Sequence, residues 1–107
     1  MNETVIQNLH ELLPEIPAET IVSRKVLSSD AVKVTLFGFA AGEELTEHTA
    51  AYPAILHFLS GEADLQLGEE RTTAVPGTWV YMPAKLPHSV YARTAVTMLL
   101  YLVVAGD

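Results

Sequence analysis

The sequence contains no cysteine and few basic residues, and each shortage excludes classes of protein. Without cysteine among its 107 residues, the chain cannot form a disulfide framework, a thiolate metal site or a cysteine nucleophile. Any transition metal must therefore be bound by nitrogen and oxygen ligands. Six lysine and arginine residues stand against 13 aspartate and glutamate residues, which gives a formal net charge of −7. Because such a chain repels phosphate backbones and anionic lipids, we expect no nucleic-acid partner and no membrane-surface role.

Long hydrophobic runs are also missing. The longest apolar stretch, from Ala95 to Ala105, contains Thr97 and is too short to cross a bilayer. The first 13 residues include Glu3 and Glu11 and lack the cationic start and unbroken apolar core of a signal peptide. The sequence therefore predicts a cytoplasmic protein. A chain of this length, half of it hydrophobic, has enough apolar residues for one core.

The N-terminus predicts a short amphipathic helix that packs on the rest of the domain. Pro14 and Pro17 would end this helix. We therefore divide the chain into an N-terminal helical segment, residues 1–19, and a main domain, residues 20–107. The apolar residues that recur at helical spacing are Val5, Ile6, Leu9, Leu12 and Leu13.

From Thr20 onward the pattern is all-β. Short runs rich in β-branched residues alternate with turn residues, which is typical of a β-sandwich or barrel. The last run is apolar on both faces, so we expect the barrel wall to cover one face and a helix or a second subunit to cover the other. The predicted strands are residues 20–27, 31–39, 54–60, 62–67, 71–75, 78–82, 89–92 and 95–104.

Two segments resemble the two halves of the cupin signature. In the first half, His48 lies at the expected spacing between Gly42 and Gly61. In the second half, Gly77, Pro83 and His88 are spaced as in that family. The resemblance covers residues 20–104 and implies a double-stranded β-helix, the cupin jelly-roll barrel, with the short helix at its N-terminus.

The chain departs from the cupin signature at several positions that matter for metal binding. Ala50 and Ala54 stand where the family has its second histidine and its glutamate. Lys85 and Ala92 replace a glycine and an asparagine of the second half. The resemblance therefore supports the fold more strongly than any one activity, because cupins carry many functions.

The resemblance implies that His48 and His88 point into the barrel mouth from facing strands. Two neutral imidazoles suit a divalent transition metal, which could be iron, manganese, nickel, copper or zinc. A third donor is needed, and His57 is the first candidate. If Ala54 faces inward, alternation turns His57 outward, whereas a bulge near Pro53 would turn His57 inward.

Three aromatic residues, Tyr52, Trp79 and Tyr81, are expected to line a barrel-mouth pocket for a small molecule. Three functions follow. The first is a small cupin that binds a small molecule and a divalent metal. The second is a metal-dependent oxygenase or isomerase that acts on a small organic substrate. The third is a metal-free ligand-binding or interaction module, and a homodimer is expected with each of them.

Overall fold

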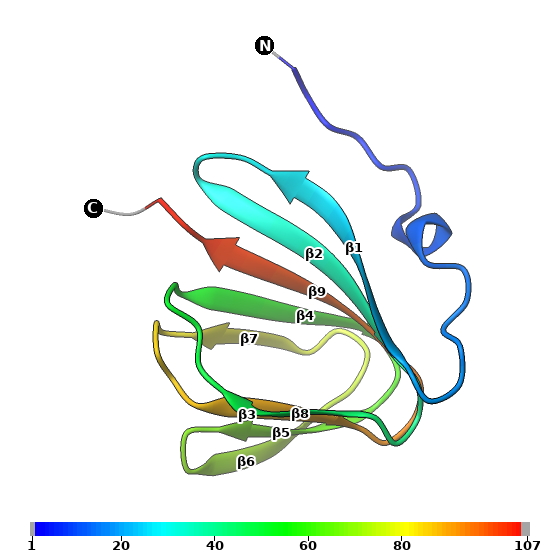
Figure 1. The fold of residues 1–107 in the computed structure, drawn as a ribbon, viewed down its shortest axis with the longest axis vertical. Helices are drawn as coiled ribbons and strands as arrows, with labels where there is room; N and C mark the ends of the chain where they lie inside the picture. The colour runs from blue at the N-terminus through cyan, green and yellow to red at the C-terminus, as the bar shows by residue number, and fades with distance from the viewer. Residues whose placement is uncertain (1, 106–107) are drawn as a thin grey trace.

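The computed structural model describes residues 2–105, so Met1 of the predicted N-terminal segment and residues 106–107 of the predicted main domain lie outside it. Two antiparallel sheets face each other as the upper and lower layers of Figure 1. The upper sheet has the strand order β1-β2-β9-β4-β7 and the lower sheet has the order β3-β8-β5-β6. The strands are β1 Ile21–Ser28, β2 Val32–Phe39, β3 Glu44–His48, β4 Ala54–Ser60, β5 Ala63–Leu67, β6 Glu70–Ala74, β7 Trp79–Met82, β8 His88–Ala92 and β9 Val96–Val103.

This arrangement confirms the predicted all-β jelly roll, and eight of the nine described strands overlap a predicted one. The missed strand is β3, Glu44–His48. Four of its five residues are exposed polar side chains, so the strand has no apolar alternation that a sequence pattern could reveal. This missed strand carries His48.

The predicted N-terminal helix is wrong over most of its length. A single 3₁₀ turn, η1 Leu9–Leu12, replaces it, and Val5 is 73% exposed. The Asn8 side chain accepts a hydrogen bond from the backbone N–H of His10 at 3.0 Å and begins the turn there. A segment this short does not form a stable α-helix by itself, because its few hydrogen bonds do not offset the cost of helix nucleation. Packing against the sheet therefore decides its conformation.

The N-terminal segment nevertheless packs on the outer face of the five-stranded sheet. Leu13 and Ile16 approach β2 so closely at Gly38 that a Cβ there would lie 2.6 Å from the Leu13 side chain. Only glycine leaves room for this contact. The contact contributes to an outer apolar cluster formed by Leu13, Val34, Leu36 and Leu99, with partly buried neighbours that include Leu9 and Ile16.

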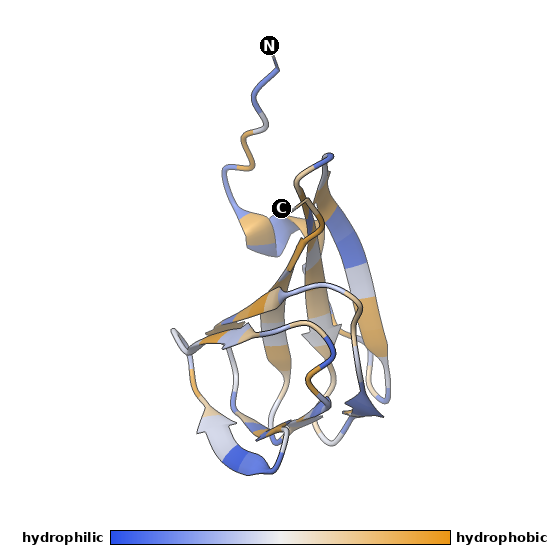
Figure 2. Ribbon diagram, turned by 90° about the vertical axis from the view of Figure 1, so that its left-hand side faces the viewer, coloured by the Kyte–Doolittle hydropathy of each residue, from blue (hydrophilic) through white to orange (hydrophobic). Residues whose placement is uncertain are grey.

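The main core lies between the two sheets. Phe39, Phe58, Leu65 and Met82 are among its buried side chains. Figure 2 shows hydrophobic stretches along the strands, whereas β3 and the hairpin between β5 and β6 are largely hydrophilic. In the part of the chain that the structure describes, no helix is long and apolar enough to span a bilayer.

The last strand, β9, contributes to both apolar clusters, as its sequence predicts. Val96 and Met98 belong to the core between the sheets, whereas Leu99 belongs to the outer cluster. The N-terminal segment therefore supplies part of the cover that the apolar sequence of this strand requires.

Two glycines at the ends of the first signature half give a test of the turn geometry. Gly42 and Gly61 both have a φ of 85°, so alanine is strained by about 1–2 kcal/mol at either position. A Cβ at Gly42 would meet nothing within 4 Å, but one at Gly61 would overlap the carbonyl oxygen of Ala95. We expect Gly61→Ala to lower the free energy of unfolding by roughly 3 kcal/mol or more, measured by urea denaturation. An equal loss in Gly42→Ala would contradict this account.

Candidate functional site

The two signature histidines are brought together by an irregular pairing between β3 and β8. Leu45 lies opposite Val90 and His48 lies opposite His88, so Thr46 and Glu47 together face Ser89. This is a β-bulge, with two residues on one strand against one on the other. Regular alternation from Leu45 would place His48 on the outside of the sheet. The bulge restores His48 to the inner face, beside His88.

The imidazole rings of His48 and His88 are in contact. Their centroids lie 4.1 Å apart with an angle of 58° between the ring planes. His88 shares its face of β8 with the core residues Val90 and Ala92 and is only 7% exposed, whereas His48 is exposed. The pair therefore runs from the interior of the barrel to its surface.

Backbone carbonyl groups fix the tautomer of both rings. The Nδ1 atom of His48 lies 2.8 Å from the carbonyl oxygen of Thr46, and Nδ1 of His88 lies 2.8 Å from that of Leu86. Because a carbonyl oxygen only accepts hydrogen bonds, each Nδ1 carries the proton. Each Nε2 is then left with its lone pair, which is the arrangement found in histidines that ligate a metal through Nε2.

The buried position of His88 also favours its neutral form. Burial lowers the pKa of His88 below its ordinary value of 6.5, and the nearby His48 lowers it further. The hydrogen bond to the carbonyl of Leu86 acts in the opposite direction but is weaker than the effect of burial. A neutral imidazole at neutral pH can accept a hydrogen bond or donate a lone pair to a metal.

The structure does not bring His57 to this pair. Leu56 and Phe58 belong to the core, so His57 lies on the outer face of β4, in register with Leu99 of the outer cluster. The bulge of this strand falls between Phe58 and Ser60, after His57, and so does not turn the ring inward. Within residues 2–105, no three histidine, aspartate or glutamate side chains gather closely enough to hold a metal.

Two of the expected pocket aromatics, Trp79 and Tyr81, are placed on the face of β7 away from the barrel interior, which corrects the expectation for these two residues. Val80 and Met82 take the inward positions of β7, so Trp79 and Tyr81 lie on the outer face, 59% and 54% exposed. Tyr52 is an exposed residue of the loop between β3 and β4. For Trp79 and Tyr81, proximity to the signature in the sequence did not predict the direction of the side chains.

The jelly roll, with two histidines that meet from neighbouring strands of one sheet, agrees with the comparison to known families. A family model described as a cupin domain matches residues 35–104. The chain belongs to the cupin family. No curated protein matches it in sequence.

Many solved structures are similar to this cupin, and three of them illustrate the likeness. One is a conserved protein of unknown function from Streptococcus pyogenes, 26% identical over 100% of this chain and 93% of the other, with a TM-score of 0.85. A cupin superfamily protein from Desulfitobacterium hafniense is 23% identical over 97% of both chains, with a TM-score of 0.85, and shows the fold alone. A Cupin 2 conserved barrel domain protein from Leptotrichia buccalis is 31% identical over 90% of this chain and 46% of the other, with a TM-score of 0.82.

Behind the histidine pair, on the outer side of the four-stranded sheet, lie three polar residues whose connection the sequence did not reveal. Gln66 donates a hydrogen bond to Glu47 and accepts one from Ser89. We call these three residues the polar bridge. The alternation of β5 does predict that Gln66 faces outward. Its partners lie 19 and 23 residues away in the sequence, so no local pattern could reveal them.

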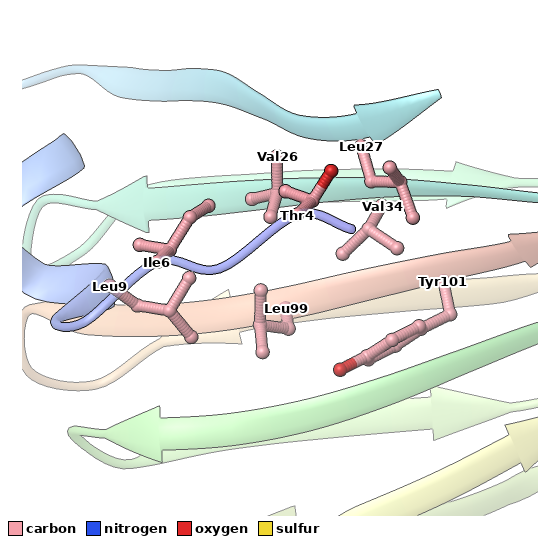
Figure 3. Close-up of a pocket in the computed structure, with 8 residues that line it drawn as sticks. All are labelled: Thr4, Ile6, Leu9, Val26, Leu27, Val34, Leu99 and Tyr101. Atoms are coloured by element: carbon pink, nitrogen blue, oxygen red, sulfur yellow. The ribbon is translucent and has the colours of Figure 1, made fainter. Parts of the chain in front are cut away.

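A separate apolar cavity of about 240 Å³ lies between the N-terminal segment and the outer face of the five-stranded sheet. Figure 3 shows Thr4 and Ile6 lying over Val34 and Leu99 at this cavity. Because these sheet residues belong to the outer cluster, the cavity is on the side of the five-stranded sheet away from the core. It results from incomplete cover of the sheet by the N-terminal segment.

The lowered pKa of His88 predicts how the stability of the metal-free protein depends on pH. A depressed pKa contributes stability that is fully present above the unfolded value, near 6.5, and that is lost as pH falls through the folded value. We expect the free energy of unfolding to fall more between pH 7.5 and 5.5 in the wild type than in His88→Asn. Denaturation with a chelator present measures both, and contributions of the carboxylates cancel in the difference. Equal slopes would show that His88 titrates normally.

Proposed function

We propose that this cupin binds a small molecule at its barrel mouth, together with a divalent transition metal held by Nε2 of His48 and Nε2 of His88. The observation that carries the proposal is the contact between two rings whose Nδ1 protons are both directed to backbone carbonyls. Two such rings present two lone pairs from neighbouring strands of the same sheet. The hydrogen bonds that the two rings make to the backbone use Nδ1, so they do not use the lone pairs on Nε2.

The donor set fits a metal that keeps open coordination positions. Ala50 and Ala54 cannot replace the donors that the cupin signature has there, so two nitrogen ligands come from the chain. The remaining positions would be taken by water or by a donor atom of the small molecule. Iron, manganese, nickel, copper and zinc all accept imidazole ligands. When bound, such an ion supplies Lewis-acid polarisation of a ligand oxygen.

The chain's own residues would then bind and orient the ligand. Buried His88 fixes the inner end of the site, and exposed His48 lies where a molecule would enter. The same ion would serve an oxygenase or isomerase acting on a small organic substrate, which is the enzymatic version of this proposal.

A metal-free binding module is the second candidate, and one observation favours it. Each Nε2 can accept a hydrogen bond from a hydroxyl or amide group of a ligand without any metal. The absence of a third protein donor close to the pair, within the described residues, agrees with this candidate. Metal analysis of protein purified without a histidine tag separates the two candidates.

Substitution of either histidine of the pair should abolish metal binding. We expect His48→Ala and His88→Ala each to remove the rise in melting temperature that Zn²⁺, Ni²⁺ or Mn²⁺ causes in the wild type, because one remaining imidazole holds these ions poorly. The measurement is thermal unfolding across a metal titration, supported by calorimetric affinities.

Two further histidines give matched controls. His10 is exposed near the N-terminus and His57 lies on the outer face of β4, so His10→Ala and His57→Ala should keep the metal response. If His57→Ala loses metal as fully as the pair variants do, the site has three histidines and the ligand assignment is wrong. A wild type that binds no metal but binds a small organic molecule at the pair would support the metal-free module.

The homodimer expected from the sequence stays a prediction, and the exposed aromatics of β7 suggest where the second copy binds. Trp79 and Tyr81 are adjacent outward residues at an edge of the five-stranded sheet. Buried aromatic anchors dominate many interfaces, so the Trp79→Ser, Tyr81→Ser double variant should shift the mass measured by light scattering from dimer to monomer. A monomeric wild type would refute the prediction.

A further inference from the structure

The side-chain amide of Gln66 connects three elements behind the histidine pair. Its Nε2 atom donates to Oε1 of Glu47 at 2.6 Å and to the carbonyl oxygen of Gly68 at 3.2 Å. Its Oε1 atom accepts from the hydroxyl of Ser89 at 3.3 Å. The two acceptors, Glu47 and the carbonyl of Gly68, contact the amide nitrogen, and the donor, the Ser89 hydroxyl, contacts the amide oxygen. These partners therefore determine which way the amide is oriented.

The polar bridge is in register with the two histidines. Gln66 pairs with Ser89 across β5 and β8, and the next residues along those strands, Leu67 and His88, also pair. Glu47 precedes His48, and Ser89 follows His88. The bridge therefore holds the backbone on both sides of the imidazole contact, one residue away and on the opposite face of the sheet.

The strand that carries His48 has little else to fix its register. β3 is an edge strand whose one neighbour in the sheet is β8. Leu45 is its one residue that packs against the core, and the other four are exposed polar side chains. The burial of apolar residues normally specifies register, and a slip of one residue turns every side chain to the other face. Such a slip in β3 would turn His48 away from His88.

The hydrogen bond from Gln66 opposes this slip at the bulge itself. Thr46 and Glu47 are the two bulge residues that face Ser89. With Glu47 tied to Gln66 on the outer side, the following residue, His48, must point to the inner side. A bulge without this contact could relax toward regular pairing, in which His48 would face outward.

We propose that Gln66 is a positioning residue of the histidine site, acting through Glu47 to hold the β3 bulge and thereby His48 against His88. The part of this proposal that concerns metal affinity rests on the proposed function. The part that concerns the contact between the two rings does not, because that contact exists in the metal-free chain.

Removal of the amide tests the proposal by two readouts. In Gln66→Ala and Glu47→Ala, we expect Zn²⁺ affinity to fall about 10- to 100-fold, the range observed when a metal ligand loses the group that orients it. In the metal-free proteins, we expect the nuclear Overhauser effects between the His48 and His88 ring protons to weaken or disappear. Thr73→Ala is the matched control, because Thr73 is an exposed residue of β6 paired with the strand that carries Gln66. This control should keep both signals.

Exchange of the two polar groups separates positioning from general destabilisation. Glu47→Gln keeps an acceptor oxygen for the amide of Gln66 and should behave like the wild type. Gln66→Glu places a carboxylate against Glu47 and against the carbonyl of Gly68, so it should lose both signals. The double variant Glu47→Gln, Gln66→Glu restores one amide and one carboxylate. It should recover most of the ring contact and of the Zn²⁺ affinity.

The outcomes distinguish failure of this proposal from failure of the proposed function. If Gln66→Ala keeps the ring contact and binds Zn²⁺ as the wild type does, the positioning role is refuted and the metal site stands. If the wild type binds no Zn²⁺ but Gln66→Ala loses the ring contact, the positioning role stands and the metal proposal fails. If the double variant is no better than Gln66→Glu, the polar bridge is not the cause and the positioning role is refuted.

Discussion

The contact between His48 and His88 depends on one irregular feature of the backbone, the bulge in β3. If β3 paired regularly with β8 and had no bulge, His48 and Leu45 would lie on opposite faces, and the two imidazoles would be on different sides of the sheet. The site is therefore a property of strand pairing more than of side-chain chemistry. Chemistry enters through the carbonyls of Thr46 and Leu86, which determine the protonated nitrogen of each ring.

The sequence predicted the strands whose apolar residues alternate and missed the strand whose residues do not. β4 was predicted with its observed ends from a short, mostly apolar run, but the sequence left the direction of His57 open. The structure decides it, because Leu56 and Phe58 face the core and His57 therefore lies on the outer face. β3 was missed because Leu45 is its one apolar residue. The family resemblance implied that His48 and His88 come from facing strands, whereas the structure places them on neighbouring, paired strands of one sheet. The bulge that brings the two rings together has no sequence pattern of its own.

The errors at the N-terminus and in β7 have different causes. Helical spacing of apolar residues predicted a helix, but Leu9, Leu12 and Leu13 pack on the sheet from a single 3₁₀ turn and the residue after it, because packing against β2 and β9 outweighs local preference. Trp79 and Tyr81 were expected in the pocket because they are aromatic and close to the signature. The parity of β7, set by Val80 and Met82, directs them to the other face. Gln66 was correctly predicted to face outward, yet its role depends on residues distant in sequence.

The position of β9 has a consequence for how the molecule unfolds. This strand lies in the middle of its sheet, and adjacent residues, Met98 and Leu99, belong to different apolar clusters. If the N-terminal segment detached, Leu99 on one face of β9 would be exposed to water, while Met98 on the other face still packs in the core between the sheets. Melting of the first segment and of the barrel should therefore be thermodynamically coupled, so that the chain denatures as one cooperative unit although its N-terminal part has almost no regular secondary structure.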